Sequence, residues 1–146
     1  MALNIAIQVI DSRWKAPLKP YTKTITQACE AAIAKSAKAT DLTVVLADNA
    51  FIQDLNTTYR GKPKPTNILS FTGEGSHLGD MVLAFEIVAE EAREQQKSFR
   101  NHVVHLLVHG MLHLQGADHE TKAEAEQMEA KEIKILKKLG VANPYL

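Results

Sequence analysis

The sequence contains little cysteine, no excess of charge of either sign and no long hydrophobic run. One cysteine in 146 residues excludes both an intramolecular disulfide and a Cys-x-x-Cys pair. Lys and Arg together number 17, as do Asp and Glu, which excludes a polycation that coats nucleic acid but not a local basic patch. No apolar stretch approaches the roughly 20 residues that span a bilayer, and no signal peptide is recognisable. We therefore expect a cytoplasmic protein without a membrane partner.

The composition is that of a folded domain. Hydrophobic residues make up 45% and charged residues 23%, which is ordinary for a globular protein. The chain, residues 1–146, has the length of a single domain and holds no repeat or linker that would divide it. Cys29 lies in the alanine-rich stretch ITQACEAAIAKSA, whose apolar helical pattern predicts a buried, unreactive thiol.

Hydrophobic periodicity predicts about four strands and about five helices. Period-two alternation and β-branched residues indicate strands at 3–10, 41–48, 67–71 and 79–85. Apolar residues at spacings of three and four indicate helices at 22–38, 49–60, 86–97, 101–115 and 121–139, and Asp48 can cap the second of them. Strands early in the chain and helices late predict an α+β, or mixed α/β, fold in which the helices pack on a sheet.

Histidines gather in the predicted helix at 101–115. Four of them would occupy an arc of about 80° on one helix face, namely His102, His105, His109 and His113. His109 and His113, four residues apart, can reach a single metal ion. Gly116 can adopt a left-handed turn that brings the chain back, so that His119 supplies a third ligand. Three protein ligands leave one coordination position open, as in catalytic zinc sites.

The spacing in HGMLHLQGADH is that of the zinc signature of the metzincin proteases, except that Gly110 stands where those proteases carry a catalytic glutamate. Two histidines on a helix are more often hydrogen-bonded core or surface residues, but the glycine and the third histidine favour a metal. Three histidines on one straight helix cannot converge on one ion. His105 would therefore support the ligands from behind or face the substrate, unless it is simply a core residue. Asp118 would orient a ligand imidazole, cap the next helix, or assist the metal-bound water.

Two long motifs carry a family resemblance. HLLVHGMLHLQGADH resembles the signature of the YbeY-type metal-dependent endoribonucleases, the bacterial rRNA maturation factor family, with Ala117 where tyrosine is usual. LNTTYRGKPKPTNILSF, residues 55–71, is similar to a second motif of the family, with Pro63 and Asn67 in place of two aspartates and Ile68 in place of valine. The resemblance extends over LGDMVLA and MEAKEIKILKKLG, and so runs from about residue 42 to residue 140.

The resemblance implies a mixed β-sheet with surrounding helices and one zinc-type ion held by His109, His113 and His119. It implies cleavage of single-stranded RNA, maturation of the 3′ end of the small-subunit (16S) rRNA, and ribosome quality control, with the small ribosomal subunit as partner and no DNA substrate. Arg60 would contact the substrate. Lys62 and Lys64 lie beside it in YRGKPK, so this loop is a candidate phosphate site, although a solvated basic loop fits the sequence equally well.

We expect metal-assisted hydrolysis of RNA phosphodiesters. The ion would lower the pKa of its bound water towards about 7, so that the missing glutamate is not needed as a base, and Arg60 would stabilise the transition state. Attack by the ribose 2′-hydroxyl remains open, and three imidazoles suit nickel, copper or iron as well as zinc. A metalloprotease is an alternative that Gly110 argues against. A ribosome assembly factor with a purely structural metal is the other alternative.

Overall fold

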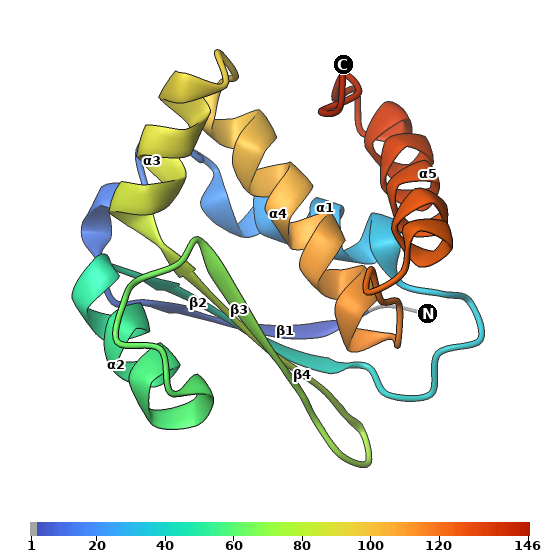
Figure 1. Cartoon of the computed structure of the whole chain (residues 1–146), viewed down its shortest axis with the longest axis horizontal. Coiled ribbons are helices and arrows are strands. Elements are labelled where there is room, and N and C mark those ends of the chain that lie inside the picture. The colour runs from blue at the N-terminus through green and yellow to red at the C-terminus, as the bar shows by residue number, and fades with distance from the viewer. Residues whose placement is uncertain (1–2) are drawn as a thin grey trace.

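Four strands form one mixed sheet in the computed structural model, which describes residues 3–146 (Figure 1). They are β1 (Asn4–Val9), β2 (Asp41–Ala47), β3 (Ile68–Thr72) and β4 (His77–Ala84), in the spatial order β1-β2-β4-β3. Strands β1, β2 and β4 are parallel neighbours, whereas β3 runs antiparallel to β4 in a hairpin. The predicted mixed sheet is confirmed, and β3 is one of its two edges.

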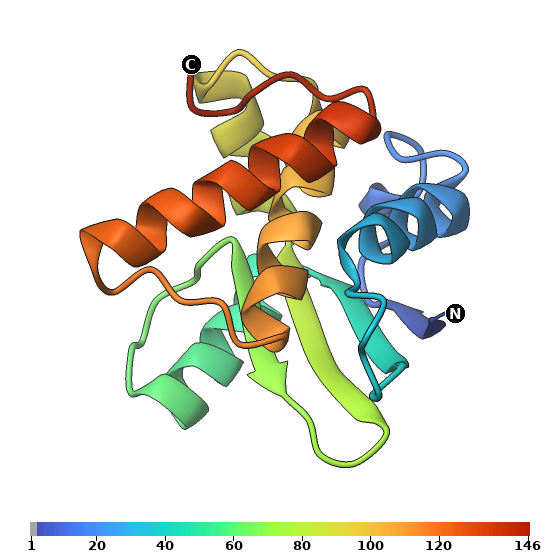
Figure 2. The same ribbon diagram turned by 90° about the vertical axis from the view of Figure 1, so that its right-hand side faces the viewer.

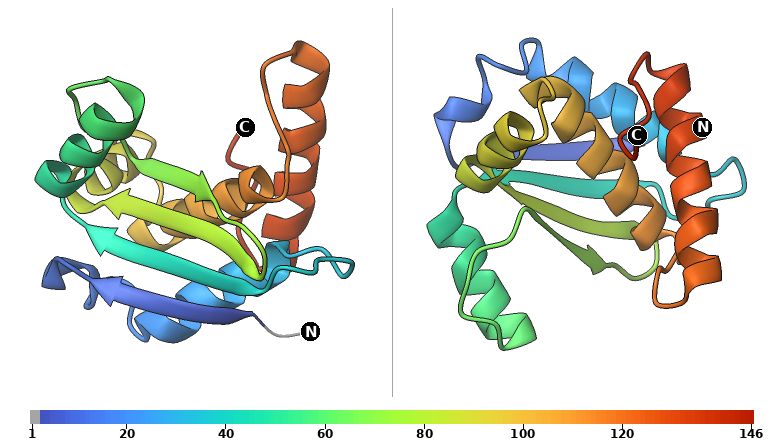
Figure 3. Two further views of the ribbon diagram at one scale, coloured as in Figure 1. Left: turned by 90° about the horizontal axis from the view of Figure 1, so that it is seen from below. Right: turned by 45° about the horizontal axis from the view of Figure 1, so that its top comes forward.

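Five helices surround this sheet, as the sequence predicts. They are α1 (Tyr21–Ala32), α2 (Asn49–Arg60), α3 (Phe85–Glu94), α4 (Phe99–Leu114) and α5 (Lys122–Lys138), and a 3-10 turn at Ser12–Trp14 precedes them. Helices α1, α4 and α5 lie on one face of the sheet, and α2 lies on the other (Figures 1 and 3). Figure 2 shows α5 crossing in front of α4. The fold is therefore a sheet with one thick helical layer and a single helix opposite.

Helix α4 is the centre of the thick layer because it is apolar on almost every side. Ten of its 16 residues are buried, and it contacts α1, α3, α5 and strand β3. Side chains of the central strands alternate between the two faces of the sheet. Val44 and Leu46 face the thick helical layer, and Val45 faces α2. No helix within residues 3–146 combines the length and the apolarity needed to cross a membrane.

The first helix ends six residues earlier than the sequence predicts. It stops at Ala32, and Ile33 is already extended, with ψ of 135°. The side chain of Gln115, from the end of α4, accepts a hydrogen bond from the Ala34 N–H at 2.8 Å and donates one to the Ala32 carbonyl at 2.8 Å. This contact across 83 residues of sequence satisfies the backbone groups at the helix end. Tertiary structure thus overrides the helical pattern of residues 33–38.

Two local predictions at helix starts have different outcomes. Asp48 caps α2, since its side chain accepts a hydrogen bond from the Phe51 N–H at 2.9 Å. The prediction that Asp118 caps the last helix is wrong. Thr121 is the cap, and it forms a reciprocal capping box with Glu124. Cys29 is fully buried, and burial raises the pKa of its thiol to about 12, as expected of an unreactive cysteine.

Candidate metal centre

The structure brings the three predicted ligands together. His109 and His113 lie one turn apart on α4, and His119 follows in the loop before α5. One ligand atom of each lies within 4.8 Å of the others. The Nε2 atoms of His109 and His113 are 3.1 Å apart, and a tetrahedral ion with bonds of about 2.0–2.1 Å needs roughly 3.3 Å between ligand atoms. The donor set and its spacing therefore fit a transition-metal ion.

Gly116 makes the turn that the third ligand requires. Its φ is +99°, a conformation that L side chains rarely adopt, and an added Cβ would meet nothing within 4 Å. The Gly116 N–H donates to the His113 carbonyl and the Ala117 N–H to the Leu112 carbonyl, each at 3.0 Å. These bonds close α4 and direct the chain back towards its ligand face. The reason for glycine here is backbone conformation rather than lack of space.

A buried carboxylate on α5 orients one ligand. Glu132 is fully buried, and its Oε1 lies 2.8 Å from Nδ1 of His109. A carboxylate can only accept, so Nδ1 carries the proton and Nε2 keeps its lone pair for a metal. Such carboxylate–histidine pairs fix both the tautomer and the direction of the ring. Glu132 is a functional residue that the motif alone does not reveal.

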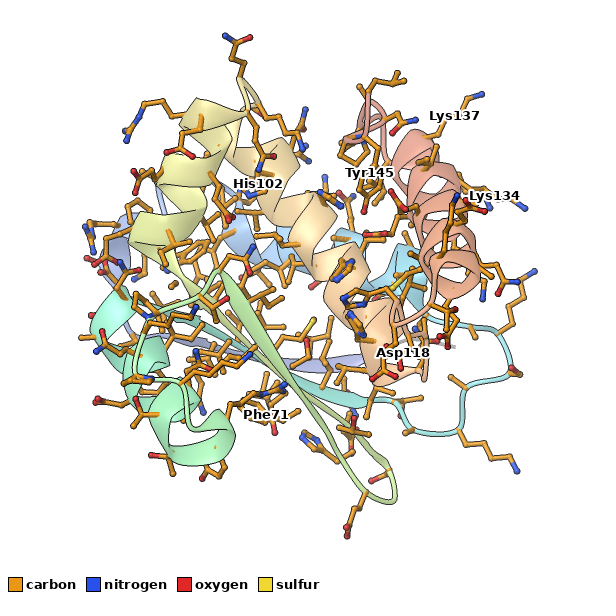
Figure 4. All side chains as sticks on the ribbon, in the orientation of Figure 1. Phe71, His102, Asp118, Lys134, Lys137 and Tyr145 are labelled. Atoms are coloured by element: carbon orange, nitrogen blue, oxygen red, sulfur yellow. The ribbon has the colours of Figure 1, made fainter. Side chains whose placement is uncertain are left out.

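Two further groups converge on the same carboxylate. Nε2 of His105 lies 3.2 Å from Oε1 of Glu132, and the Tyr145 hydroxyl donates to Oε2 at 2.8 Å. Burial would raise the pKa of Glu132, but the hydrogen bonds from His105, His109 and Tyr145 outweigh burial and lower it to about 2. Tyr145 belongs to the C-terminal segment and lies between α4 and α5 (Figure 4). Glu132 is therefore an anion held by three partners behind the ligands.

His113 is biased towards its neutral, metal-binding form. Burial lowers the pKa of His113, and the neighbouring His109 and His119 lower it further. A neutral imidazole offers a lone pair, whereas an imidazolium does not. The lowered pKa of His113 therefore favours the form that can bind a cation.

Gly110 explains why a glutamate is absent from this signature. It is buried where α4 crosses the sheet, and an added Cβ would lie 2.5 Å from Sδ of Met81 and 3.2 Å from Oγ of Ser70. A carboxylate at this position would enter the packed interface between α4 and the hairpin of β3 and β4. The residue that replaces the protease glutamate is therefore a packing residue in this fold.

A cleft of about 480 Å³ opens over the histidines. Its walls come from β3, α4 and the C-terminal segment, and Arg60 lines it together with the three ligands. The Arg60 guanidinium donates to the Ser70 carbonyl at 3.1 Å and lies over the Phe71 ring, 5.6 Å from its centroid. Lys62 and Lys64 are exposed in the loop after α2 and do not line the cleft. Of the predicted substrate-binding cations, the structure places Arg60 at the metal site and the two lysines beyond it.

The remaining predicted residues take separate places. His105 lines the cleft, but its Nε2 faces Glu132 and Tyr145, which suits the predicted role behind the ligands. Asp118 accepts a hydrogen bond from the backbone N–H of His119 at 2.7 Å, and within residues 3–146 it makes no hydrogen bond to an imidazole. It shapes the ligand loop, while Glu132 performs the orientation expected of Asp118. In Figure 4, Asp118 lies at the end of α4 opposite His102.

Asn67, one of the departures from the family motif, belongs to a polar network. Its Nδ2 donates to Oε1 of Glu91 at 3.1 Å, and the same oxygen lies 2.9 Å from Nε2 of His102. Burial lowers the pKa of His102 more than the contact with Glu91 raises it. Asn67 thus ties the start of β3 to α3 and α4. His102 is part of this structural network and lies outside the metal cleft.

The family model and the related sequences agree on one family. A family model described as endoribonuclease YbeY matches residues 6–140. Proteins named endoribonuclease YbeY are 46% identical in Chromobacterium violaceum, over 93% of this chain and 85% of that protein, and 40% identical in Rhizobium etli, over 98% and 93%. The one from Magnetococcus marinus is 50% identical over 73% and 83%. A solution structure of a Thermotoga maritima protein shares the fold, with a TM-score of 0.58, 24% identity, and coverage of 93% and 91%.

Proposed function

Because this chain belongs to the endoribonuclease YbeY family, we propose that it is a metal-dependent endoribonuclease that hydrolyses phosphodiesters of single-stranded RNA. The observation that carries the proposal is the convergence of His109, His113 and His119 in a cleft that also holds Arg60. A cation site and a guanidinium face the same cavity. This arrangement suits a phosphodiester, because the cation and the guanidinium can each bind its negative oxygens.

His109, His113 and His119 would hold one ion per chain, which we propose to be zinc. An ion held by three imidazoles supplies Lewis acidity, which polarises a phosphoryl oxygen and makes a water near it more acidic. Glu132 keeps Nδ1 of His109 protonated and the ring in place. His105 and Tyr145 hold Glu132 in turn. The protein's own contribution is thus to fix the tautomer and the direction of the His109 ring before any substrate enters.

Arg60 is proposed to bind the phosphate and to stabilise the charge that develops on it. Its side chain is fixed on one side by the Ser70 carbonyl and by the Phe71 ring, so that little ordering is needed on binding. One Nη2 hydrogen bond to Ser70 leaves other guanidinium N–H groups free for phosphate oxygens. Lys62 and Lys64 would contact phosphates that flank the reacting one, since they lie outside the cleft.

The biological substrate is proposed from the motif resemblance. The resemblance supports action on the 3′ end of the small-subunit 16S rRNA and in ribosome quality control, with the small ribosomal subunit as partner. That substrate places the protein in the cytoplasm. Neither the histidine cluster nor the basic loop distinguishes one RNA sequence from another.

The test is RNA cleavage by protein of measured metal content, compared with His113→Ala. The variant must match the original in circular dichroism and melting temperature. We expect the variant to lose cleavage along with bound metal, whereas equal activity in both preparations would identify a contaminating nuclease and overturn the proposal. The products also report the route, because 3′-hydroxyl and 5′-phosphate ends indicate direct attack by water. A 2′,3′-cyclic phosphate would instead indicate attack by the ribose 2′-hydroxyl.

A further inference from the structure

A second cavity lies on the face of the sheet opposite the metal. It measures about 530 Å³ and is formed by α2 together with all four strands. Seen from below (Figure 3, left), α2 covers one end of this face, and no other helix in residues 3–146 lies in front of it. The rest of the face is open to solvent. The proposed function uses nothing in this cavity.

Aromatic rings form one wall of this cavity. They come from Phe51 and Tyr59 on α2 and from Phe71 on β3. Tyr59 is 68% exposed, which is unusual for so large an apolar ring. The Tyr59 and Phe71 rings meet edge to face, with centroids 5.6 Å apart, so that each ring is held by the other. A held, solvent-exposed ring is a platform on which a planar group can stack at little entropic cost.

The opposite side of the cavity is polar. The side chains there are Gln8 on β1, Thr43 on β2 and Asp80 on β4. One oxygen of Asp80 lies 3.0 Å from Nε2 of His77, while its other oxygen makes no hydrogen bond within residues 3–146. An amide, a hydroxyl and a carboxylate together offer both donors and acceptors. An aromatic wall facing such a set suits a flat heterocycle with a polar edge.

The two cavities lie on opposite sides of the edge strand β3. Ser70 and Phe71 are successive residues of the edge strand β3, and they face the metal cleft and the aromatic cavity respectively. Arg60 lines the metal cleft, bonds the Ser70 carbonyl and lies over the Phe71 ring. The exposed Lys62 and Lys64 follow immediately. Arg60 therefore lies between the two cavities, where its guanidinium can contact a polyanion that passes from one to the other.

We propose that the aromatic cavity is a nucleobase subsite for the same RNA strand that is cut at the metal. The strand would pass over β3 with a phosphate on Arg60, and would stack an unpaired base on Tyr59. Gln8, Thr43 and Asp80 would bind the edge of that base, and the carboxylate favours bases with N–H donors. The inference rests on the proposed ribonuclease function and adds to it a reason for preferring single strands, because a paired base cannot leave its stack to enter the cavity.

The test combines protein variants with RNA lacking single bases. Cleavage by the metal-loaded enzyme is measured on an unstructured RNA oligonucleotide and on a series in which one nucleotide after another is abasic. Tyr59→Ala should raise KM by about 5- to 140-fold, the cost of losing one stacked base, without an equal fall in kcat. Tyr59→Phe, which keeps the ring, should restore the low KM. Ile10→Ala is the matched control, because Ile10 is half exposed and lines neither cavity.

The abasic series identifies the stacked nucleotide. The original enzyme should lose affinity at one abasic position, and Tyr59→Ala should be insensitive to that same position. The subsite is overturned if the effects of Tyr59→Ala and of the abasic position simply add, or if Tyr59→Ala leaves KM unchanged. In either case, cleavage by the original enzyme still supports the proposed ribonuclease function. If the original enzyme cleaves no RNA, the proposed function fails instead. Fluorescence anisotropy of the same oligonucleotides then decides the subsite by the same comparison, in Kd rather than KM.

Discussion

Replacing Glu132 by glutamine tests how the protein prepares its ligand His109. The substitution preserves shape and keeps an oxygen that can accept the hydrogen bond from Nδ1, but it removes the charge that three partners share. Charge-assisted hydrogen bonds are roughly twice as strong as neutral ones. Loss of such a partner behind a ligand typically weakens metal affinity about 10- to 100-fold. We expect a loss in that range, equivalent to about 1.4–2.7 kcal/mol of binding free energy.

Metal affinity is measured by competition with a chromophoric chelator, on protein whose folding is checked by circular dichroism. Glu126→Gln provides the control, since Glu126 is an exposed carboxylate on the same helix. Glu132→Ala serves as a harsher variant: it leaves buried partners unsatisfied and should lower the free energy of unfolding by about 3–5 kcal/mol. A folded Glu132→Gln protein that binds metal as tightly as the original would refute the role assigned to this carboxylate.

Three further predictions concern stability and are measured by chemical denaturation. Gly110→Ala should lower the free energy of unfolding by about 1–2 kcal/mol, because overpacking against Met81 outweighs the gain in helix propensity; a more stable variant would contradict the packing role. Asn67→Asp should cost about 1–3 kcal/mol, since it replaces a donor to Glu91 by a second carboxylate, and an unchanged unfolding midpoint would show that this network contributes nothing. Gln115→Ala should lower the free energy of unfolding by about 1–3 kcal/mol through lost hydrogen bonds at the end of α1. An unchanged free energy of unfolding would mean that α1 ends at Ala32 without help from Gln115.

The histidine cluster was predictable from the sequence because it is local. His109, His113 and Gly116 lie within eight residues, and helix geometry with a left-handed turn fixes where His119 must go. The strand and helix pattern was predictable for the same reason, since periodicity reports which face of each element is buried. Arg60 came from the family motif, and the structure places it in the same cleft.

The support behind the ligands was not predictable in this way, because it depends on how α5 crosses α4. Glu132 lies 23 residues from His109 in sequence. One signal was present: Glu132 falls between Met128 and Leu136 at spacings of four, so that a charge interrupts an apolar helix face. A buried carboxylate in such a position needs partners, and the histidines of α4 are the available ones. Tyr145 gave no comparable signal, because its position depends on the path of the C-terminal segment.

The central claim is that RNA cleavage depends on a metal held by His109, His113 and His119. It is tested most directly by removing metal with a chelator, adding zinc back in measured amounts, and following RNA cleavage against bound metal. The account predicts that cleavage is absent without metal, rises in proportion to bound zinc, and stops rising at one ion per chain. Cleavage by the metal-free protein at the rate of the loaded protein would contradict it.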